Sequence, residues 1–124
     1  MECTVRTYSI LVVDDDEGIR DSIEDMLCMS GYGTLKAPDA ESALEILEHS
    51  PPDLILLDGN LPGMKGEEFT QHLRSGNCEL PIIGISAEDR RQAMLDAGVN
   101  AFIDKPFDPP TFIDFIDQIL DRDD

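Results

Sequence analysis

Short apolar runs alternate with amphipathic segments along most of the 124-residue chain. Runs rich in Ile, Leu and Val predict buried strands at 10–13, 54–57, 82–85 and 101–103, and a weaker pattern predicts another at 32–36. The stretches that follow carry apolar residues three and four positions apart, which is typical of helices that cover one face of a core. The pattern therefore predicts five strand–helix units in succession.

Polar residues and glycine mark the ends of several expected helices. Asp39 and Asp108 precede apolar periodic segments and can cap them, and the two prolines after Asp108 suit a first helical turn. Gly31 is expected to end the first helix, because glycine readily adopts the left-handed conformation found just past a helix C-terminus. We assign Asp16 and Glu17 to the start of that helix, where acids cap N–H groups and interact well with the helix dipole.

Such alternation predicts an α/β fold, in which a parallel sheet is covered by helices on both faces. We expect a doubly wound, flavodoxin-like (βα)5 sheet with strand order 2-1-3-4-5, which is common for five-stranded sheets of this class. Residues 1–124 have the length of one domain and show no internal repeat or linker. A single domain is therefore expected, with no output domain in this chain.

Composition excludes several classes of function. The chain carries 27 acids and nine lysines and arginines, a formal charge of −18, whereas nucleic-acid binding needs a basic surface. No apolar run approaches the length of a membrane span, and the N-terminus lacks the pattern of a signal peptide. The three cysteines are scattered without metal-ligand spacing. We therefore expect a cytoplasmic protein that binds neither nucleic acid nor membrane.

Acidic residues follow two of the predicted strands. Asp14, Asp15 and Asp16 come directly after the first strand, and Asp58 ends the third. In the expected order these two strands are neighbours at the topological switch point, where open α/β sheets bind ligands. Clustered carboxylates repel one another, and Mg²⁺ relieves this because it prefers carboxylates, waters and phosphate oxygens. The alternative is that these acids are ordinary solvated side chains.

Two further residues end strands at the same predicted edge. Lys105 follows the fifth strand and is one of only three lysines in the chain, while Ser86 ends the fourth. The lysine could pair with Asp58 and bind a phosphoryl oxygen. Each residue alone has an ordinary explanation, as a solvated lysine or a serine in a turn. Acids, a hydroxyl and a lysine together at the ends of four strands form a more specific pattern.

Other catalytic patterns are not found in the sequence. His49 and His72 are expected on helix surfaces away from the strand ends, which argues against a Ser-His-Asp triad. Neither a GxGxxG nor a GxxxxGK[ST] segment occurs, so dinucleotide-binding and P-loop interpretations also fail.

The segments ILVVDDDEGIR, DLILLDGNLPGMKG, IIGISA, the AG of DAGVNAF, and FIDKPF resemble, in this order, the response-regulator receiver domains of two-component signal transduction. The resemblance spans nearly the whole chain. It implies a domain that accepts a phosphoryl group from a sensor histidine kinase or a histidine phosphotransfer protein. It also implies a phosphoprotein that is not a turnover enzyme. A downstream effector or a second copy would bind through the fourth helix, strand five and the last helix.

The resemblance also implies individual roles and a Mg²⁺ ion, with Mn²⁺ as a substitute. Asp58 would be phosphorylated, and Asp14, Asp15, Asp58 and the backbone carbonyl of Asn60 would bind the metal ion. Catalysis would involve Asp58, Lys105 and Ser86, and switching would involve Ser86 and Phe102.

Three positions depart from the pattern typical of the family. Gly59 follows the expected phosphoacceptor where an apolar residue is usual, which favours a more mobile loop. Phe102 has no hydroxyl group, so any switch at this position works by packing. The segment from Ser86 to Lys105 is about one helical turn shorter than usual. The output surface is therefore less well defined by the sequence than the phosphorylation site.

Two alternative functions remain from the sequence. The segment LILLDGN resembles the start of haloacid-dehalogenase-like phosphohydrolases, but position 60 is Asn where those enzymes need a second acid. A degenerate receiver that only binds partners is the other alternative. The complete set of acids and Lys105 argue against it.

Overall fold

The computed structural model of the chain describes residues 8–59, 61, 63–86, 91–104 and 108–120. These residues form one five-stranded parallel sheet in the order β2-β1-β3-β4-β5. The strands are β1 (Ser9–Val13), β2 (Gly33–Ala37), β3 (Leu54–Asp58), β4 (Ile82–Ser86) and β5 (Ala101–Asp104). The predicted α/β class, strand order and flavodoxin-like topology are confirmed.

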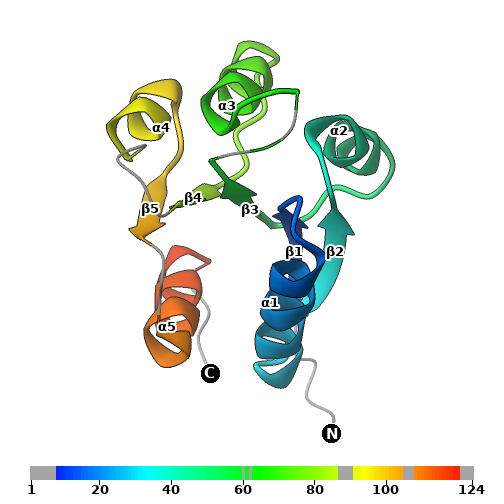
Figure 1. Ribbon diagram of the computed structural model, residues 1–124, viewed down its shortest axis with the longest axis vertical. Helices are drawn as coiled ribbons and strands as arrows, with labels where there is room; N and C mark the ends of the chain where they lie inside the picture. The colour runs from blue at the N-terminus through cyan, green and yellow to red at the C-terminus, as the bar shows by residue number, and fades with distance from the viewer. Residues whose placement is uncertain (1–7, 60, 62, 87–90, 105–107, 121–124) are drawn as a thin grey trace, which may run out of the picture.

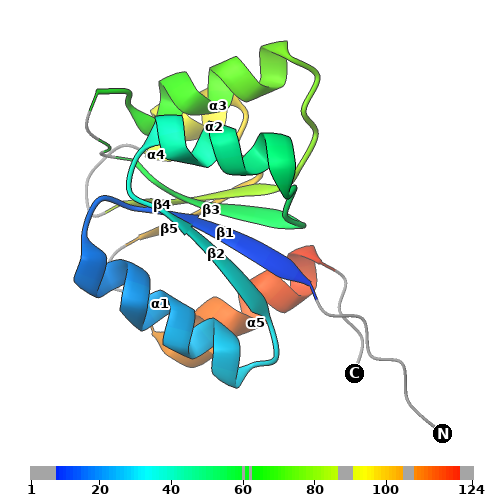
Figure 2. The ribbon, with the colours of Figure 1, turned by 90° about the vertical axis from the view of Figure 1, so that its right-hand side faces the viewer.

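Five helices follow the strands in turn. They are α1 (Glu17–Met29), α2 (Ala40–His49), α3 (Gly66–Ser75), α4 (Arg91–Ala97) and α5 (Pro109–Ile119). Figures 1 and 2 show α1 and α5 on one face of the sheet, and α2, α3 and α4 on the other. None of the described helices is both long and apolar enough to cross a lipid bilayer.

The sheet separates two apolar clusters. Leu11 and Val13 of β1 join the cluster beneath α2, α3 and α4, whereas Ile10 and Val12 join the cluster beneath α1 and α5. Successive side chains of a strand point to opposite faces, so one uninterrupted apolar run supplies both clusters. This explains why the central strands read as continuous apolar runs and not as alternating ones.

The helix starts agree with the local signals in the sequence. Asp16, Asp39 and Asp108 are the N-cap residues of α1, α2 and α5, and each carboxylate accepts a hydrogen bond from the backbone N–H three residues later. The backbone bond to Asp39 lowers the pKa of that carboxyl group, because it favours the charged form. Gly31 has φ of +89°, the left-handed conformation expected after a helix.

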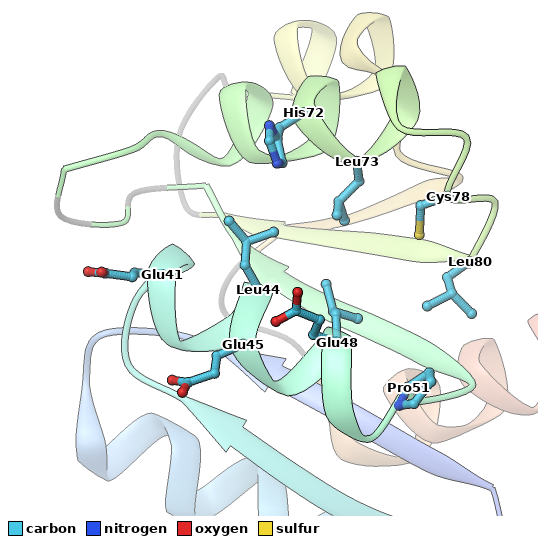
Figure 3. A pocket seen from close by; sticks show the side chains of 10 residues that line it. Glu41, Leu44, Glu45, Glu48, Pro51, His72, Leu73, Cys78 and Leu80 are labelled. Carbon is cyan, nitrogen blue, oxygen red and sulfur yellow. The ribbon is translucent and has the colours of Figure 1, made fainter.

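A groove remains on the face that carries three helices. Helix α3 packs against α4, whereas α2 packs on β1 and β2. Between α2 and α3 lies a hollow of about 720 Å³ (Figure 3). This hollow lies away from the strand ends that carry the acidic residues.

Arg74 near the end of α3 ties three segments together through backbone carbonyls. Its guanidinium donates to the carbonyl of Gly98 at 3.0 and 2.9 Å, and to the carbonyls of Cys78 and Leu80 at 2.8 and 2.9 Å. It also donates to the side-chain oxygen of Asn100 at 2.9 Å. One rigid side chain therefore joins the end of α3 to the segments that enter β4 and β5.

Replacing Arg74→Ala should lower the free energy of unfolding by about 2–3 kcal/mol, because several partly buried carbonyls lose their donor. Urea unfolding followed by circular dichroism measures this. Arg91→Ala is the matched control, since Arg91 forms an ion pair on an exposed surface and its loss should cost less than about 1 kcal/mol. Equal losses in the two variants would contradict a clamping role for Arg74.

Candidate functional site

Three carboxylates meet at the carboxyl edge of the sheet. Strands β1 and β3 are adjacent and parallel, with Val13 beside Leu57, so the residues that follow them emerge side by side. Carboxylate oxygens of Asp14, Asp15 and Asp58 all lie within 4.8 Å of one another. Asp14 and Asp58 are only 3% and 6% exposed, while Asp15 is exposed. The structure thus brings together three residues that are far apart in the sequence.

This donor set fits a hard divalent cation. Mg²⁺ binds carboxylate oxygens and keeps several waters, so it suits a cluster with two buried carboxylates and one that faces solvent. Close carboxylates also repel one another in a poorly hydrated edge of the protein, and a bound cation relieves that repulsion. The arrangement could therefore hold a magnesium ion or a similar cation.

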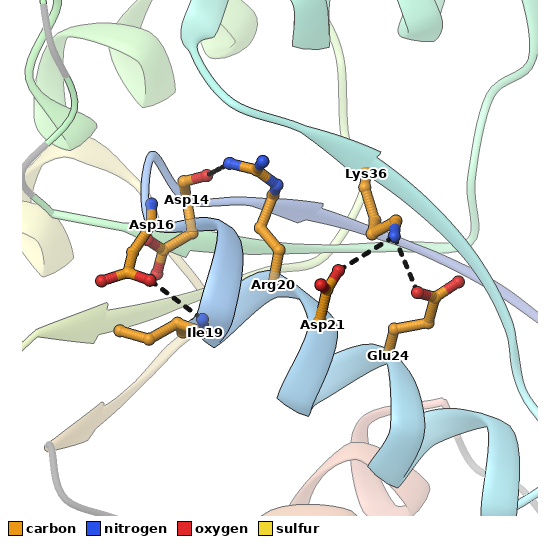
Figure 4. Close-up of polar contacts among 7 residues, drawn as sticks. All are labelled: Asp14, Asp16, Ile19, Arg20, Asp21, Glu24 and Lys36. Carbon is orange, nitrogen blue, oxygen red and sulfur yellow. Dashed lines mark hydrogen bonds and ion pairs between the residues drawn. The ribbon is translucent and has the colours of Figure 1, made fainter.

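The turn from β1 into α1 fixes the position of Asp14. Its backbone N–H donates to the carbonyl of Ala37 at 3.1 Å, and one carboxylate oxygen accepts from the backbone N–H of Asp16 at 2.9 Å. The guanidinium of Arg20 reaches back from α1 and donates to the backbone carbonyl of Asp14 at 2.7 Å (Figure 4). Asp14 is therefore held through its backbone and its side chain.

Sequence reasoning did not identify Arg20 as part of this region. The only signal was a basic residue about one turn into an acid-rich helix start, and such residues are usually solvated. The fold gives it a specific partner, because the first turn of α1 lies against the end of β1. Arg20 thereby adds positive charge next to the acidic cluster.

Lys36 of β2, also drawn in Figure 4, forms ion pairs with a different group of acids. Its ammonium contacts Glu24 at 2.7 Å and Asp21 at 3.2 Å, both on α1 (Figure 4). The hydrogen bond to Glu24 is the main cause that raises the pKa of Lys36 above its ordinary value, and the hydrogen bond to Asp21 is the next largest. Both bonds favour the charged form. Lys36 therefore ties β2 to α1.

Gly66 at the start of α3 lies against the segment that follows Asp58. A Cβ atom at this position would lie 3.0 Å from both the Asp58 carbonyl oxygen and the Gly59 Cα, and 2.9 Å from a methyl carbon of Met94. The Gly66 N–H donates to the Gly59 carbonyl at 3.2 Å, and the Gly59 N–H donates to Ile85 at 3.0 Å. Gly59 is thus hydrogen-bonded through both its N–H and its carbonyl. The more mobile loop that the sequence predicted after Asp58 stays a prediction, because residues 60 and 62 lie outside the described residues.

The remaining predicted site residues are described only in part. Ser86 is the last residue of β4, one position beyond the residue that pairs with Asp58 in the sheet. Asn60 and Lys105 lie outside the described residues, so their predicted roles stay predictions. Phe102 of β5 is 7% exposed, on the face of the sheet covered by α2, α3 and α4.

Comparison with known proteins identifies the family. A sequence profile of the response regulator receiver domain matches residues 10–117. The chain belongs to this family. Response regulator MprA from Mycobacterium sp. (strain KMS) is 40% identical to this receiver domain over 101 residues, which cover 79% of the chain and 44% of MprA. The chain thus spans less than half the length of that relative.

Solved structures agree with this assignment. The receiver domain resembles a putative response regulator from Chloroflexus aurantiacus J-10-fl, with a TM-score of 0.89 and 30% identity over 94% of this chain and 100% of the other. It also resembles the receiver domain of sensor histidine kinase PA1611 from Pseudomonas aeruginosa PAO1, with a TM-score of 0.85 and 28% identity over 94% and 99% of the two chains. The PA1611 structure has a magnesium ion coordinated in its active-site cleft.

Removing any carboxylate of the cluster should weaken Mg²⁺ binding. We expect Asp14→Asn, Asp15→Asn and Asp58→Asn each to raise the Kd for Mg²⁺ by at least about tenfold, because each removes a charged ligand. The chain has no Trp, so isothermal titration calorimetry is the suitable measurement. Asp16→Asn is the control, since Asn caps a helix as well as Asp and should leave the Kd within about threefold. Equal effects at all four positions would indicate only general electrostatic attraction.

Gly66→Ala should disturb the segment after Asp58, because the added methyl group meets backbone atoms there. We expect a loss of about 1–3 kcal/mol in the free energy of unfolding and weaker Mg²⁺ binding. Gly76→Ala is the control, since its nearest neighbours would lie 3.6 Å away and its φ is −91°. Urea unfolding and calorimetry measure the two effects. Unchanged Mg²⁺ affinity in a folded Gly66→Ala protein would show that this contact does not position the cluster.

Proposed function

We propose that this receiver domain accepts a phosphoryl group on Asp58 from a phosphohistidine of a sensor histidine kinase or a histidine phosphotransfer protein. The observation that carries the proposal is the convergence of Asp58 with Asp14 and Asp15 at the carboxyl edge of the sheet. Membership of the receiver domain family supports it. Phosphorylation then alters the surface that binds partners.

In the proposed reaction, a carboxylate oxygen of Asp58 attacks the phosphorus atom of the phosphohistidine. The new P–O bond forms as the P–N bond breaks, and the electron pair of that bond leaves with the imidazole. Asp58 then carries an acyl phosphate, which water can later hydrolyse. Bound Mg²⁺ would supply positive charge opposite the phosphoryl oxygens.

Other residues would orient the phosphoryl group and bind its oxygens. We assign the backbone carbonyl of Asn60 to the metal, the hydroxyl of Ser86 to a phosphoryl oxygen, and the ammonium of Lys105 to another. Such contacts lower the barrier mainly through position and charge, since the transition state spreads negative charge over these oxygens. Asp58 is modified once per cycle, so the domain is a stoichiometric acceptor.

The proposed switch needs more than one contact. Moving a population from 1:99 to 99:1 takes about 5.5 kcal/mol, and one charge-assisted hydrogen bond from Ser86 supplies about 1.5–3 kcal/mol. Lys105 and the metal must therefore also favour the active conformation. Phe102 of β5 is the residue proposed to change its packing between the two conformations. The centroid of its ring lies 4.9 Å from the guanidinium carbon of Arg91. Arg91 also pairs with Asp104 at 2.6 Å.

The proposed output surface consists of α4, β5 and α5, where an effector or a second copy would bind. A hollow of about 250 Å³ there is lined by Arg91, Phe102 and Phe115 among others. Phe112 is 1% exposed and belongs to the core, whereas Ile113 and Phe115 are partly buried. Phe115 and Phe112 both line this hollow, and the partly buried Phe115 offers it more accessible surface, whereas Ile113 lines a different hollow beside α1.

The two alternative functions are less well supported. A haloacid-dehalogenase-like phosphohydrolase would need a second acid two residues after its nucleophile, where this chain has Asn60. The family match is to the response regulator receiver domain. A receiver that only binds partners has no need for three converging carboxylates, two of them buried.

Incubation with a small phosphodonor and Mg²⁺ should add one phosphoryl group to the protein, as measured by intact mass spectrometry. Asp58→Ala should gain none, because the acceptor oxygen is missing, and chelation of Mg²⁺ should suppress the reaction in the wild type. Lys105→Ala and Ser86→Ala should slow it by at least about tenfold. Asp16→Asn should react like the wild type. Equal phosphorylation of the Asp58→Ala protein would refute the assignment.

A further inference from the structure

The groove between α2 and α3 has an apolar floor that the proposed phosphorylation does not use. Leu44 and Leu47 of α2 and Leu80 before β4 are partly exposed there, beside the nearly buried Leu73 of α3. Figure 3 shows Leu44 and His72 facing each other from α2 and α3, with Leu80 farther along the groove. These apolar side chains are partly exposed to solvent, and a partner that buried them would gain hydrophobic stabilisation.

The groove continues along α2 toward the loop that follows β3. A second hollow of about 510 Å³ shares Glu41 and Leu44 with the first, and is also lined by Gly63 and Met64. The two together extend along α2, which has ten residues and is therefore about 15 Å long. A groove of this length accommodates about three turns of a helix.

An acidic edge on α2 runs beside this apolar floor. Glu41, Glu45 and Glu48 are exposed and spaced four and three residues apart, so they share one side of the helix. Glu48 lies in the last turn, where the helix dipole disfavours negative charge. Among the described residues that line either hollow, none is a lysine or arginine. His72 lines the first hollow and His49 ends α2, so the lysines or arginines of a partner would add to two imidazoles and not to an existing basic patch.

We propose that the α2–α3 groove binds a basic amphipathic helix of a partner protein. Leucine-like side chains of the partner would cover Leu44, Leu47 and Leu80, while its lysines or arginines would pair with Glu45 and Glu48. Burial of the apolar stripe supplies affinity, and the charge pattern sets orientation.

A second copy of the chain is a poor occupant. It would bring 27 acids and nine lysines and arginines to an edge that is already acidic, and like charges disfavour association. Met64 at one end of the groove suits a binding surface, because its flexible thioether adapts to different apolar partners. The partner is therefore defined by its chemistry: an apolar stripe flanked by positive charge on a helix of about three turns.

The test uses a stapled helical peptide of about 14 residues, roughly four turns, with leucines at helical spacing and lysines beside them. Titration into the unphosphorylated, ¹⁵N-labelled protein should shift the amide resonances of 41–49 and 72–80. Resonances of 17–29 and 109–119, on the opposite face of the sheet, should not change (Figure 2). Because no phosphorylation is involved, failure here leaves the proposed reaction at Asp58 standing.

Variants separate the groove from general electrostatic attraction. Glu45→Gln with Glu48→Gln should raise the Kd of the peptide by about fivefold, since each exposed ion pair contributes a factor of about two to three. Asp25→Asn with Asp114→Asn removes the same charge from exposed positions on α1 and α5 and should leave the Kd within about twofold. A peptide with serine in place of leucine should bind at least about tenfold more weakly.

Four results would each overturn the proposal. One is no binding of the leucine–lysine peptide up to about millimolar concentration, which is the weakest association of interest. Another is an equal loss of affinity in the two double variants, or equal binding of a sequence-scrambled peptide. The last is concentration-dependent dimerisation of the protein alone with shifts at the same groove resonances, which would make a second copy the occupant.

Discussion

Repulsion among carboxylates at the ends of β1 and β3 is the constraint on which the functional site depends. The parallel pairing of these strands brings Asp14 and Asp15 next to Asp58, two of them almost fully buried. Such a cluster is costly without a balancing charge, and its negative field favours a divalent cation. In the proposed reaction, an oxygen of Asp58 beside that cation would be the nucleophile. The proposed metal binding and the proposed phosphoryl transfer at this edge would thus both follow from one arrangement of charge.

Rigid packing around the cluster keeps its members in place. Arg20 and the N–H of Asp16 hold the turn that carries Asp14, and Gly66 allows α3 to approach the backbone after Asp58 closely. A Cβ at Gly66 would lie 3.0 Å from backbone atoms of Asp58 and Gly59, so that backbone would have to shift slightly. The first turns of α1 and α3 therefore support the site, so a movement of either turn would change the positions of the carboxylates. If Asp58 is phosphorylated as proposed, these contacts offer a physical route from the phosphoryl group to the helices.

The high negative charge of the chain is divided among groups of acids with different roles. Asp16, Asp39 and Asp108 cap helices, and Asp21 and Glu24 balance Lys36. Those at the sheet edge form the candidate metal site, while those along α2 border the apolar groove on the three-helix face. A net charge of −18 alone indicates only a solvated surface that avoids nucleic acid. The positions of the acids in the fold, and not their number, separate these roles.

The sequence by itself determined the strands and helices, the caps at Asp39 and Asp108, and the placement of acids after the first and third strands. These features depend on apolar periodicity and on hydrogen bonds between residues a few positions apart. The strand order came from the commonest arrangement of such sheets and not from any residue. Only the tertiary structure decided that Arg20 contacts the Asp14 carbonyl, that Gly66 lies against Asp58, and that α2 and α3 leave a groove. Each of these depends on how closely distant segments approach, which side-chain packing across the whole domain sets and no local pattern records.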